Sequence, residues 1–315
     1  GRGRLSQRPL DEYCRIFESQ GIIYYTRTGG LPITFSGKLR PGVFKVKGNV
    51  SSQFISGLLF SLPLLDGDSE IIITTPIESK GYIDLTIDTI KDFSIEVENH
   101  NYEYFKVKGK QSYKAARCRV EGDYSQAAFG LVAGTLNGNI TCNDLESGSL
   151  QGDKCIIDIL TEMGADLVVK DNSVTARSSK TFGITIDASQ CPDLVPPLAV
   201  LGALSKGTTR IINAGRLRIK ESDRLKAIST ELSKLGAKIA ETPDGLEIYG
   251  RDMLEGGAVD SWNDHRIAMA LAVAALRCKN PVIINNSDSV GKSYPNFWND
   301  FRKLGGIIDE FHLRQ

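Results

Sequence analysis

The segment 228–250, "ISTELSKLGAKIAETPDGLEIYG", decides the fold because it joins three elements in a fixed order. Its first part carries apolar residues at helical spacing and ends at Gly236, a residue type that commonly closes helices in the left-handed conformation. Two stretches of alternating apolar residues follow, separated by a short turn, which is typical of paired strands. The segment therefore predicts a helix, a stop, a strand, a turn and a second strand.

The same pattern occurs five times along the chain. The other copies are residues 12–37, 87–109, 156–178 and 297–311, and the last has no room for a second strand before the sequence ends. Their helices stop at Gly21, Phe93, Gly164 and Gly305, so the intervals between consecutive stops are 72, 71, 72 and 69 residues by subtraction. Such a period predicts a repeated structural unit.

A second series of helices runs in step with the first. These segments are rich in small apolar residues and start near Asn49, Asp123, Asp193 and Asp264, at intervals of 74, 70 and 71 residues. Asn and Asp are favoured helix N-caps, and an apolar surface nearly all round predicts burial. Each unit should therefore contain one buried helix, one amphipathic helix and about four strands, although the repeat alone could be architecture without chemistry.

Composition limits the classes of function. The 315 residues suffice for two domains, and the 38 basic and 38 acidic side chains balance, which argues against a nucleic-acid binder. No apolar run reaches membrane-spanning length and no signal peptide is present, so a cytoplasmic location is expected. The scattered cysteines predict reduced thiols and no metal site; they are Cys14, Cys118, Cys142, Cys155, Cys191 and Cys278.

Polar residues at the starts of the buried helices suggest a site for anions. If these N-termini converge, their unpaired N–H groups can bind phosphate without an excess of Lys or Arg. Ser51, Ser52 and Gln53 offer further donors, or they are simple caps. Asp193 is likewise an ordinary cap or a candidate general base.

The string "RLRIKESDR", residues 216–224, places Lys220 and Arg224 where a helix begins. Cations there oppose the helix dipole unless an anion offsets them. Glu221 and Asp223 could neutralise the string internally, or the two cations meet a bound anionic ligand, with Glu221 among them for proton transfer. Further cations stand in "NDHR" (263–266), in "GKSYPNF" (291–297) and at Arg2, Arg4 and Arg8.

Together these motifs resemble the 5-enolpyruvylshikimate-3-phosphate synthase family. The resemblance covers essentially the whole chain in the family's order. It rests on "GRGRLSQRP" (1–9), "GNVSSQF" (48–54), "ESKGYIDLT" (78–86), "GDYSQAAF" (122–129), "PDLVPPLAV" (192–200), "RLRIKESDR" (216–224), "NDHRIAMALAVAAL" (263–276) and "GKSYP" (291–295).

The resemblance implies an α/β (α+β) fold of two domains, built from βαβαββ units around buried parallel helices. Residues 1–121 would be the remainder of the first, shikimate 3-phosphate domain with about two repeats, and residues 122–315 the second domain with three. Family members carry about a hundred more N-terminal residues, including substrate-contacting motifs that this sequence lacks, so the first domain would be incomplete. They transfer the enolpyruvyl group of phosphoenolpyruvate to the 5-hydroxyl of shikimate 3-phosphate, without a cofactor, and glyphosate competes for the phosphoenolpyruvate site in susceptible members.

The resemblance also implies roles for individual residues. Asp193 would accept the hydroxyl proton and Glu221 would handle the proton at the methylene carbon, while His265 would support the site. Phosphoenolpyruvate would be held by Arg4, Arg224, Arg266 and Lys292. Shikimate 3-phosphate would be bound by Ser51, Ser52, Gln53, Ser79 and Tyr82, with Lys220 from the other domain.

Two alternatives remain at this stage. The sister transferase acting on UDP-N-acetylglucosamine has a Cys five residues before an Arg-Pro pair, whereas Gly3 stands five residues before the pair Arg8-Pro9 here. An inactive fragment or a non-catalytic phosphate-binding protein could share the repeats. Phosphoenolpyruvate turnover would separate this second alternative from the transferase.

Overall fold

The computed structural model describes residues 3–27 and 29–310 and divides into two compact units. The first unit comprises Gly1–Glu121, Gly148–Gly152 and Ser189–Pro192, and the second comprises Gly122–Ser147, Asp153–Ala188 and Asp193–Gln315. Arg2 and the end of the fifth repeat copy lie outside the described residues. The domain limits predicted from the sequence stay a prediction.

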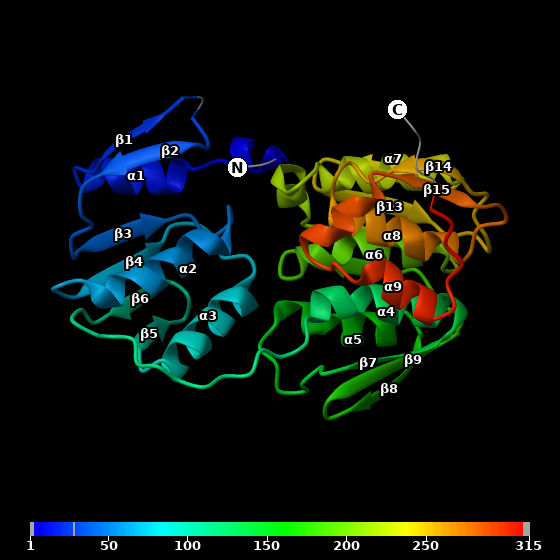
Figure 1. The fold of residues 1–315 in the computed structure, drawn as a ribbon, viewed down its shortest axis with the longest axis horizontal. Coiled ribbons are helices and arrows are strands. Elements are labelled where there is room, and N and C mark those ends of the chain that lie inside the picture. The colour runs from blue at the N-terminus through cyan, green and yellow to red at the C-terminus, as the bar shows by residue number, and fades with distance from the viewer. Residues whose placement is uncertain (1–2, 28, 311–315) are drawn as a thin grey trace. The chain divides into compact units, whose positions relative to one another are not determined.

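The first unit contains a four-stranded sheet in the order β3-β4-β6-β5 and a separate hairpin β1-β2 (Figure 1). Its strands are β1 (Ile23–Thr26), β2 (Ile33–Ser36), β3 (Val43–Val46), β4 (Ser69–Ile73), β5 (Val97–His100) and β6 (Tyr104–Val107). Its helices are α1 (Asp11–Ser19), α2 (Ser52–Ser61) and α3 (Lys80–Asp92), with short 3-10 turns η1 (Gly3–Gln7) and η2 (Leu62–Leu64).

The core of the first unit lies between its sheet and α2 and α3. Alternate residues of β3 point inward, so Phe44 and Val46 are buried while Val43 and Lys45 are exposed. They pack in one cluster with apolar residues of α2, such as Leu59. Burial of these side chains stabilises the unit by removing apolar surface from water.

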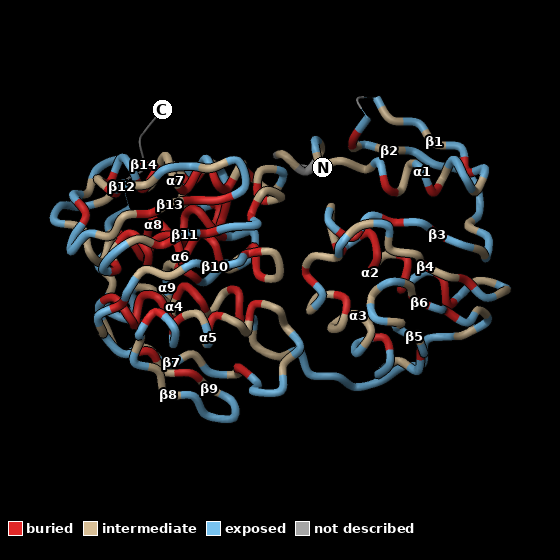
Figure 2. The backbone as a smooth tube through the Cα atoms, turned by 180° about the vertical axis from the view of Figure 1, so that it is seen from behind, coloured by how far each residue is buried: buried red, intermediate tan, exposed pale blue. Residues whose placement is uncertain are grey.

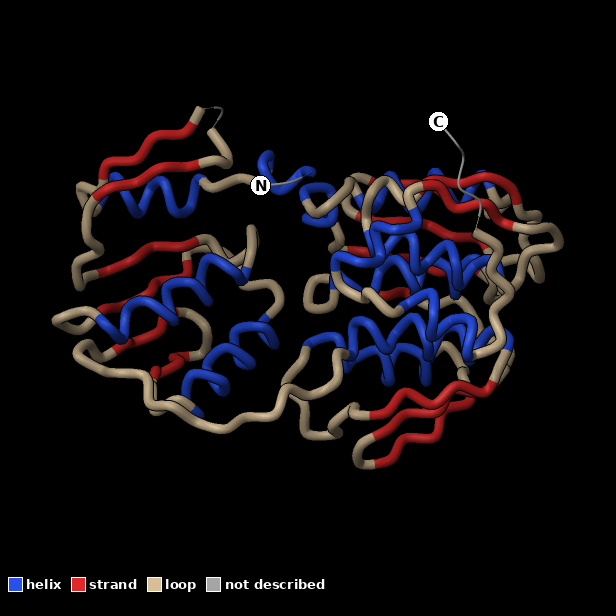
Figure 3. The backbone as a smooth tube through the Cα atoms, viewed as in Figure 1, coloured by secondary structure: helices blue, strands red, loops and turns tan. Residues whose placement is uncertain are grey.

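The second unit surrounds three buried helices with strands (Figure 3). Its helices are α4 (Tyr124–Asn137), α5 (Ile156–Glu162), α6 (Val195–Ala203), α7 (Arg224–Lys234), α8 (His265–Ala275) and α9 (Phe297–Lys303). The strands are β7 (Asn139–Asn143), β8 (Asp166–Lys170), β9 (Ser173–Arg177), β10 (Thr185–Asp187), β11 (Thr208–Ile212), β12 (Lys238–Thr242), β13 (Gly245–Tyr249), β14 (Gly257–Asp260) and β15 (Val282–Asn285). They form sheets in the orders β7-β9-β8, β10-β11-β13-β12 and β14-β15.

Three of the four helices predicted to be buried are confirmed, whereas α2 is buried on one face only and exposes Gln53, Phe60 and Ser61. Every residue of α6 is buried, as are all residues of α8 from His265 to Ala274 (Figure 2). The helices α4, α6 and α8 pack on one another, which explains their small apolar residues: small side chains let helix axes approach closely.

The predicted helix ends are confirmed with one shift. Gly21, Gly164, Gly236 and Gly305 each follow a helix and have φ between 67° and 99°. In the second copy the left-handed residue is Ser94, with φ of 66°, so the stop at Phe93 was placed one residue early. A strand was also predicted after Gly305, but the described residues 306–310 form none.

Two of the four predicted N-caps are wrong. Asp123 and Asp264 do cap α4 and α8, but α2 is capped by Ser51 and not by Asn49. Leu194 precedes α6 without a side-chain cap, and Asp193 lies in the 3-10 turn η4 (Pro192–Leu194). The Asp193 carboxylate is therefore directed to other partners.

Among the described residues, the structure contains no helix long and apolar enough to cross a membrane. Within the same residues, His, Cys, Asp and Glu side chains form no group suited to a metal ion.

Candidate active site

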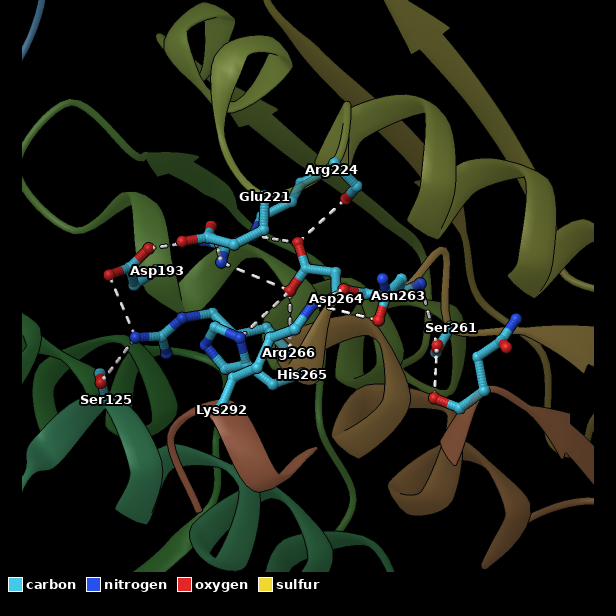
Figure 4. Close-up of polar contacts among 12 residues, drawn as sticks. Ser125, Asp193, Glu221, Arg224, Ser261, Asn263, Asp264, His265, Arg266 and Lys292 are labelled. Atoms are coloured by element: carbon cyan, nitrogen blue, oxygen red, sulfur yellow. Dashed lines mark hydrogen bonds and ion pairs between the residues drawn. The ribbon is translucent and has the colours of Figure 1, made fainter. Parts of the chain in front are cut away.

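Arg224 is the centre of a buried cluster of charges in the second unit. The string 216–224 passes through the 3-10 turn η5 (Gly215–Ile219) and α7 begins at Arg224, where Asp223 caps the helix by accepting from the Lys226 amide at 3.1 Å. The Arg224 side chain is only 2% exposed and donates to three carboxylates (Figure 4). Nε contacts Asp264 Oδ2 at 2.9 Å, Nη1 contacts Asp193 Oδ1 at 2.7 Å, and Nη2 contacts Glu221 Oε2 at 2.6 Å.

These contacts explain how a helix can begin with a cation. Burial alone would lower the pKa of Arg224, but the charges of Asp264, Asp193 and Glu221 raise it above its ordinary value. The guanidinium is therefore permanently charged and neutralised from within the protein. Of the two explanations offered for the string, internal neutralisation describes Arg224 in this structure, with two of the three carboxylates coming from outside the string.

Asp193 bridges two arginines. Its Oδ1 accepts from Arg224, and its Oδ2 accepts from Arg266 Nη2 at 3.1 Å. Burial would raise the pKa of this carboxyl, but the positive charges of Arg266, Arg224 and Lys220 outweigh burial and hold the pKa well below its usual range. Asp193 is thus a carboxylate at every physiological pH.

Arg266, at the start of α8, has unused hydrogen-bonding capacity. Its Nη2 donates to Asp193 and to Ser125 Oγ at 3.0 Å, and Ser125 lies in the first turn of α4. Nε and Nη1 are buried, yet no acceptor for either exists among the described residues. Unpaired donors on a buried cation are costly, and an anionic ligand would satisfy them.

His265 is a buried neutral imidazole. Its Nδ1 lies 3.7 Å from Asp264 Oδ1 and has no hydrogen-bond partner among the described residues. Burial, reinforced by Arg224 and Arg266 and opposed chiefly by Asp264, lowers its pKa from 6.5 to about 4. At neutral pH it therefore adds no charge to the cluster.

Two lysines lie at the margin of the cluster. Lys220 is half-buried, and burial, followed by the charges of Arg224 and Arg216, lowers its pKa against the opposing effect of Asp193 and Glu221. Lys292, at the end of η6 (Ser287–Lys292), is exposed; its Nζ donates to the Asn263 carbonyl and, at 3.1 Å, to Asn263 Oδ1.

The remaining predicted residues belong to the first unit. Ser51 caps α2 by accepting from the Gln53 amide at 3.3 Å, and Ser52 is buried at the first helical position. Ser79 precedes α3 with φ of 55°, a costly conformation for a residue with a side chain and one that often marks functional positions. Tyr82 lies in the first turn of α3 and Arg4 lies in η1.

The structure thus brings Asp193, Glu221, Arg224 and Arg266 into one cluster, with His265 beside it. The sequence analysis did not include Asp264 and Ser125 among the site residues. Asp264 was predicted only as the start of a buried helix, and Ser125 stood in the motif 122–129 without a predicted role. The signal that could have found Asp264 is its position directly before His265 and Arg266, in a turn already rich in charge.

The fold and the cluster together define a class of protein: an α/β protein of repeated units, in which arginines at the starts of the amphipathic helix α7 and the buried helix α8 pair with carboxylates. Comparison with known proteins gives the family. The profile of EPSP synthase (3-phosphoshikimate 1-carboxyvinyltransferase) matches residues 1–301, so the chain belongs to this family of transferases.

Individual relatives agree with this assignment. The 3-phosphoshikimate 1-carboxyvinyltransferase of Clostridium novyi is 62% identical over 99% of this chain and 72% of the relative, and that of Clostridium acetobutylicum is 58% identical over 99% and 73%. The structure of EPSP synthase from Acinetobacter baumannii matches with a TM-score of 0.80 at 24% identity, over 97% of this chain and 72% of that one. The predicted fold class is therefore confirmed.

Proposed function

We propose that this chain transfers the enolpyruvyl group of phosphoenolpyruvate to the 5-hydroxyl of shikimate 3-phosphate and releases phosphate, a step of aromatic amino-acid biosynthesis. The observation that carries the proposal is Arg266, a buried guanidinium with two nitrogens that lack acceptors among the described residues. The relatives at 58–62% identity are 3-phosphoshikimate 1-carboxyvinyltransferases, which supports the same reaction.

Phosphoenolpyruvate presents a carboxylate and a phosphate, and the proposed ligands are cations. Arg266 offers Nε and Nη1, while Lys292 and Arg4 add charge. Arg224 is occupied by three carboxylates in this structure, so its contact with substrate requires one of them to leave. Glu221 is the candidate, because its side chain is 32% exposed and those of Asp193 and Asp264 are 16% and 0% exposed.

Asp193 and Glu221 are the proposed proton carriers. The 5-hydroxyl oxygen attacks the central carbon of phosphoenolpyruvate and its proton passes to Asp193, while Glu221, which takes up a proton after it leaves Arg224, donates that proton to convert the methylene into a methyl group. Phosphate then leaves and a methyl proton returns to Glu221. The carbon–carbon double bond of the enolpyruvyl group is thereby formed again. Asp193 is a weak base while both arginines hold it, so anionic substrate at Arg224 and Arg266 would raise its basicity by competing for their charge.

Shikimate 3-phosphate would be bound by hydroxyl and amide groups of the first unit together with Lys220. Proposed ligands are Ser51, Ser52, Gln53, Ser79 and Tyr82. We assign residues 1–121 and 122–315 to the family's two domains, and we expect glyphosate to compete with phosphoenolpyruvate and the protein to be cytoplasmic. No metal or organic cofactor enters the proposed reaction.

The test is release of inorganic phosphate from the two substrates, each omitted in turn. We expect release only when both are present, and a fall of kcat by about 10²–10⁴-fold in Asp193→Ala and Glu221→Ala, the range typical of general acid–base groups. Asp223→Ala, which removes the helix cap of α7 two residues after Glu221, is the control and should retain turnover. Absence of release from the folded wild-type protein would contradict the proposal and favour a non-catalytic phosphate-binding role.

A further inference from the structure

The turn between β14 and α8 has an unusual backbone. Trp262 and Asn263 are consecutive residues in the left-handed region, with φ of 54° and 55°. Residues with side chains adopt this conformation at a cost, so the surrounding structure must hold it in place. The turn leads directly into Asp264 and Arg266, and its position therefore sets the position of the anion-binding end of α8.

A buried glutamate on α7 holds one side of this turn. Glu231 is only 1% exposed; its Oε2 accepts from the Asp260 amide at 2.9 Å and its Oε1 accepts from Trp262 Nε1 at 2.7 Å. Lys234 Nζ donates to both oxygens at 2.9 Å and balances the charge. One carboxylate thus joins α7 to the residue before the turn and to the first left-handed residue within it.

The other side of the turn contacts the candidate substrate cations. Asp264 caps α8 by accepting from the Arg266 amide at 3.0 Å. Asn263 accepts from Lys292 through its carbonyl and its side chain. A shift of Trp262 would therefore displace both Arg266 and Lys292, although Glu231 contacts neither.

We infer that Glu231 is a positioning residue for the phosphoenolpyruvate side of the reaction, acting through Asp260 and Trp262 on Arg266 and Lys292. The inference rests on the proposed function and extends it to a residue outside the charge cluster. A buried carboxylate suits this task because hydrogen bonds to a charged acceptor are stronger than neutral ones. A misplacement of about 1 Å is enough to impair a substrate site severely.

The first unit contains a matched control. Glu12 of α1 is 4% exposed, accepts from the Lys47 amide at 3.1 Å and pairs with Arg15. It holds the chain after β3 and before α2, as Glu231 holds the chain before α8. Glu12→Gln disturbs a comparable buried contact in the other unit.

The experiment compares Glu231→Gln, Lys234→Met and Glu12→Gln by steady-state kinetics. We expect Glu231→Gln to raise KM for phosphoenolpyruvate on the order of tenfold, with KM for shikimate 3-phosphate unchanged, because the amide cannot accept from both donors. Lys234→Met keeps both acceptors, so both KM values should stay near wild type in the folded protein, although loss of the counter-charge of the buried Glu231 should lower its stability. Glu12→Gln should leave KM for phosphoenolpyruvate unchanged.

A second measurement does not depend on activity. Amide hydrogen exchange should accelerate at residues 260–264 in Glu231→Gln and stay at the wild-type rate in Lys234→Met. In the double variant Glu231→Gln/Trp262→Phe, KM for phosphoenolpyruvate should fall part of the way back to the wild-type value. The single remaining side-chain oxygen can then accept from the Asp260 amide. Unchanged KM for phosphoenolpyruvate, or an equal rise in Glu12→Gln, would overturn the inference while leaving wild-type turnover, and so the proposed function, intact. If the wild-type protein is inactive, the proposed function is wrong. Unchanged hydrogen exchange at residues 260–264 in Glu231→Gln would then show independently that Glu231 does not hold the turn.

Discussion

Helices α2 and α8 both follow a strand and a turn, but they begin with different side chains. Each follows a strand and a turn held by a buried glutamate, Glu12 or Glu231. The start of α2 carries the uncharged Ser51, Ser52 and Gln53, whereas α8 starts with Asp264, His265 and Arg266. The repeat therefore supplies the position of a helix N-terminus, and the first few side chains decide whether that position presents uncharged or charged groups.

The largest expected effect is a loss of folding stability. It should be greater at the start of α8, where the cap Asp264 pairs with Arg224, than at the uncharged start of α2. Arg224→Met removes the guanidinium that pairs with Asp193, Glu221 and Asp264 and leaves the fully buried Asp264 without its arginine, which typically costs about 3–5 kcal/mol. Ser51→Ala removes a neutral cap from α2 and should cost about 1 kcal/mol. Denaturant unfolding of both variants measures the difference, and equal losses would break the comparison between a charged and an uncharged helix start.

A smaller effect concerns pH. The pKa of His265 falls from 6.5 to about 4 on folding, so between these values the unfolded chain binds a proton that the folded protein excludes. Stability should therefore rise with pH across this window, by roughly 3 kcal/mol at most. His265→Gln should flatten the rise between pH 4 and 6.5 in unfolding measurements, without changing stability much at pH 7.5.

The Asp193 carboxylate affects stability in a lower pH window, and with the same sign as His265. The pKa of Asp193 is lowered on folding, so its contribution to stability is present above its ordinary pKa and is lost as pH falls below about 4. A slope that persists between pH 4 and 6.5 in His265→Gln would show that another group, and not the imidazole, titrates there.

The sequence predicted what depends on local pattern. Helical spacing and the glycine at Gly236 placed α7 and its end, and the alternating residues after it placed β12 and β13. The buried helices followed from their uniform apolar character. Errors occurred where two residue types serve one purpose, since Ser94 replaces glycine after α3 and Ser51 replaces Asn49 as a cap.

The charge cluster could be predicted only in part. Glu221 stands three residues before Arg224, so their contact was within reach of the helix rules. Asp264 lies 40 residues away and Asp193 31 residues away, and their contacts arise because repeats pack side by side. Whether Asp193 caps a helix or pairs with arginines depends on this packing, which the local sequence does not encode.

The proposed reaction requires the unpaired nitrogens of Arg266 to bind the anionic groups of phosphoenolpyruvate. The most direct test is the rise in melting temperature that phosphoenolpyruvate produces in the presence of shikimate 3-phosphate, because a ligand that binds only the folded protein stabilises it by an amount that grows with ligand concentration relative to Kd. We predict a concentration-dependent rise in the wild-type protein that Arg266→Met abolishes, while Arg210→Met, at an exposed ion pair with Glu247, retains it. An undiminished rise in Arg266→Met would contradict the account.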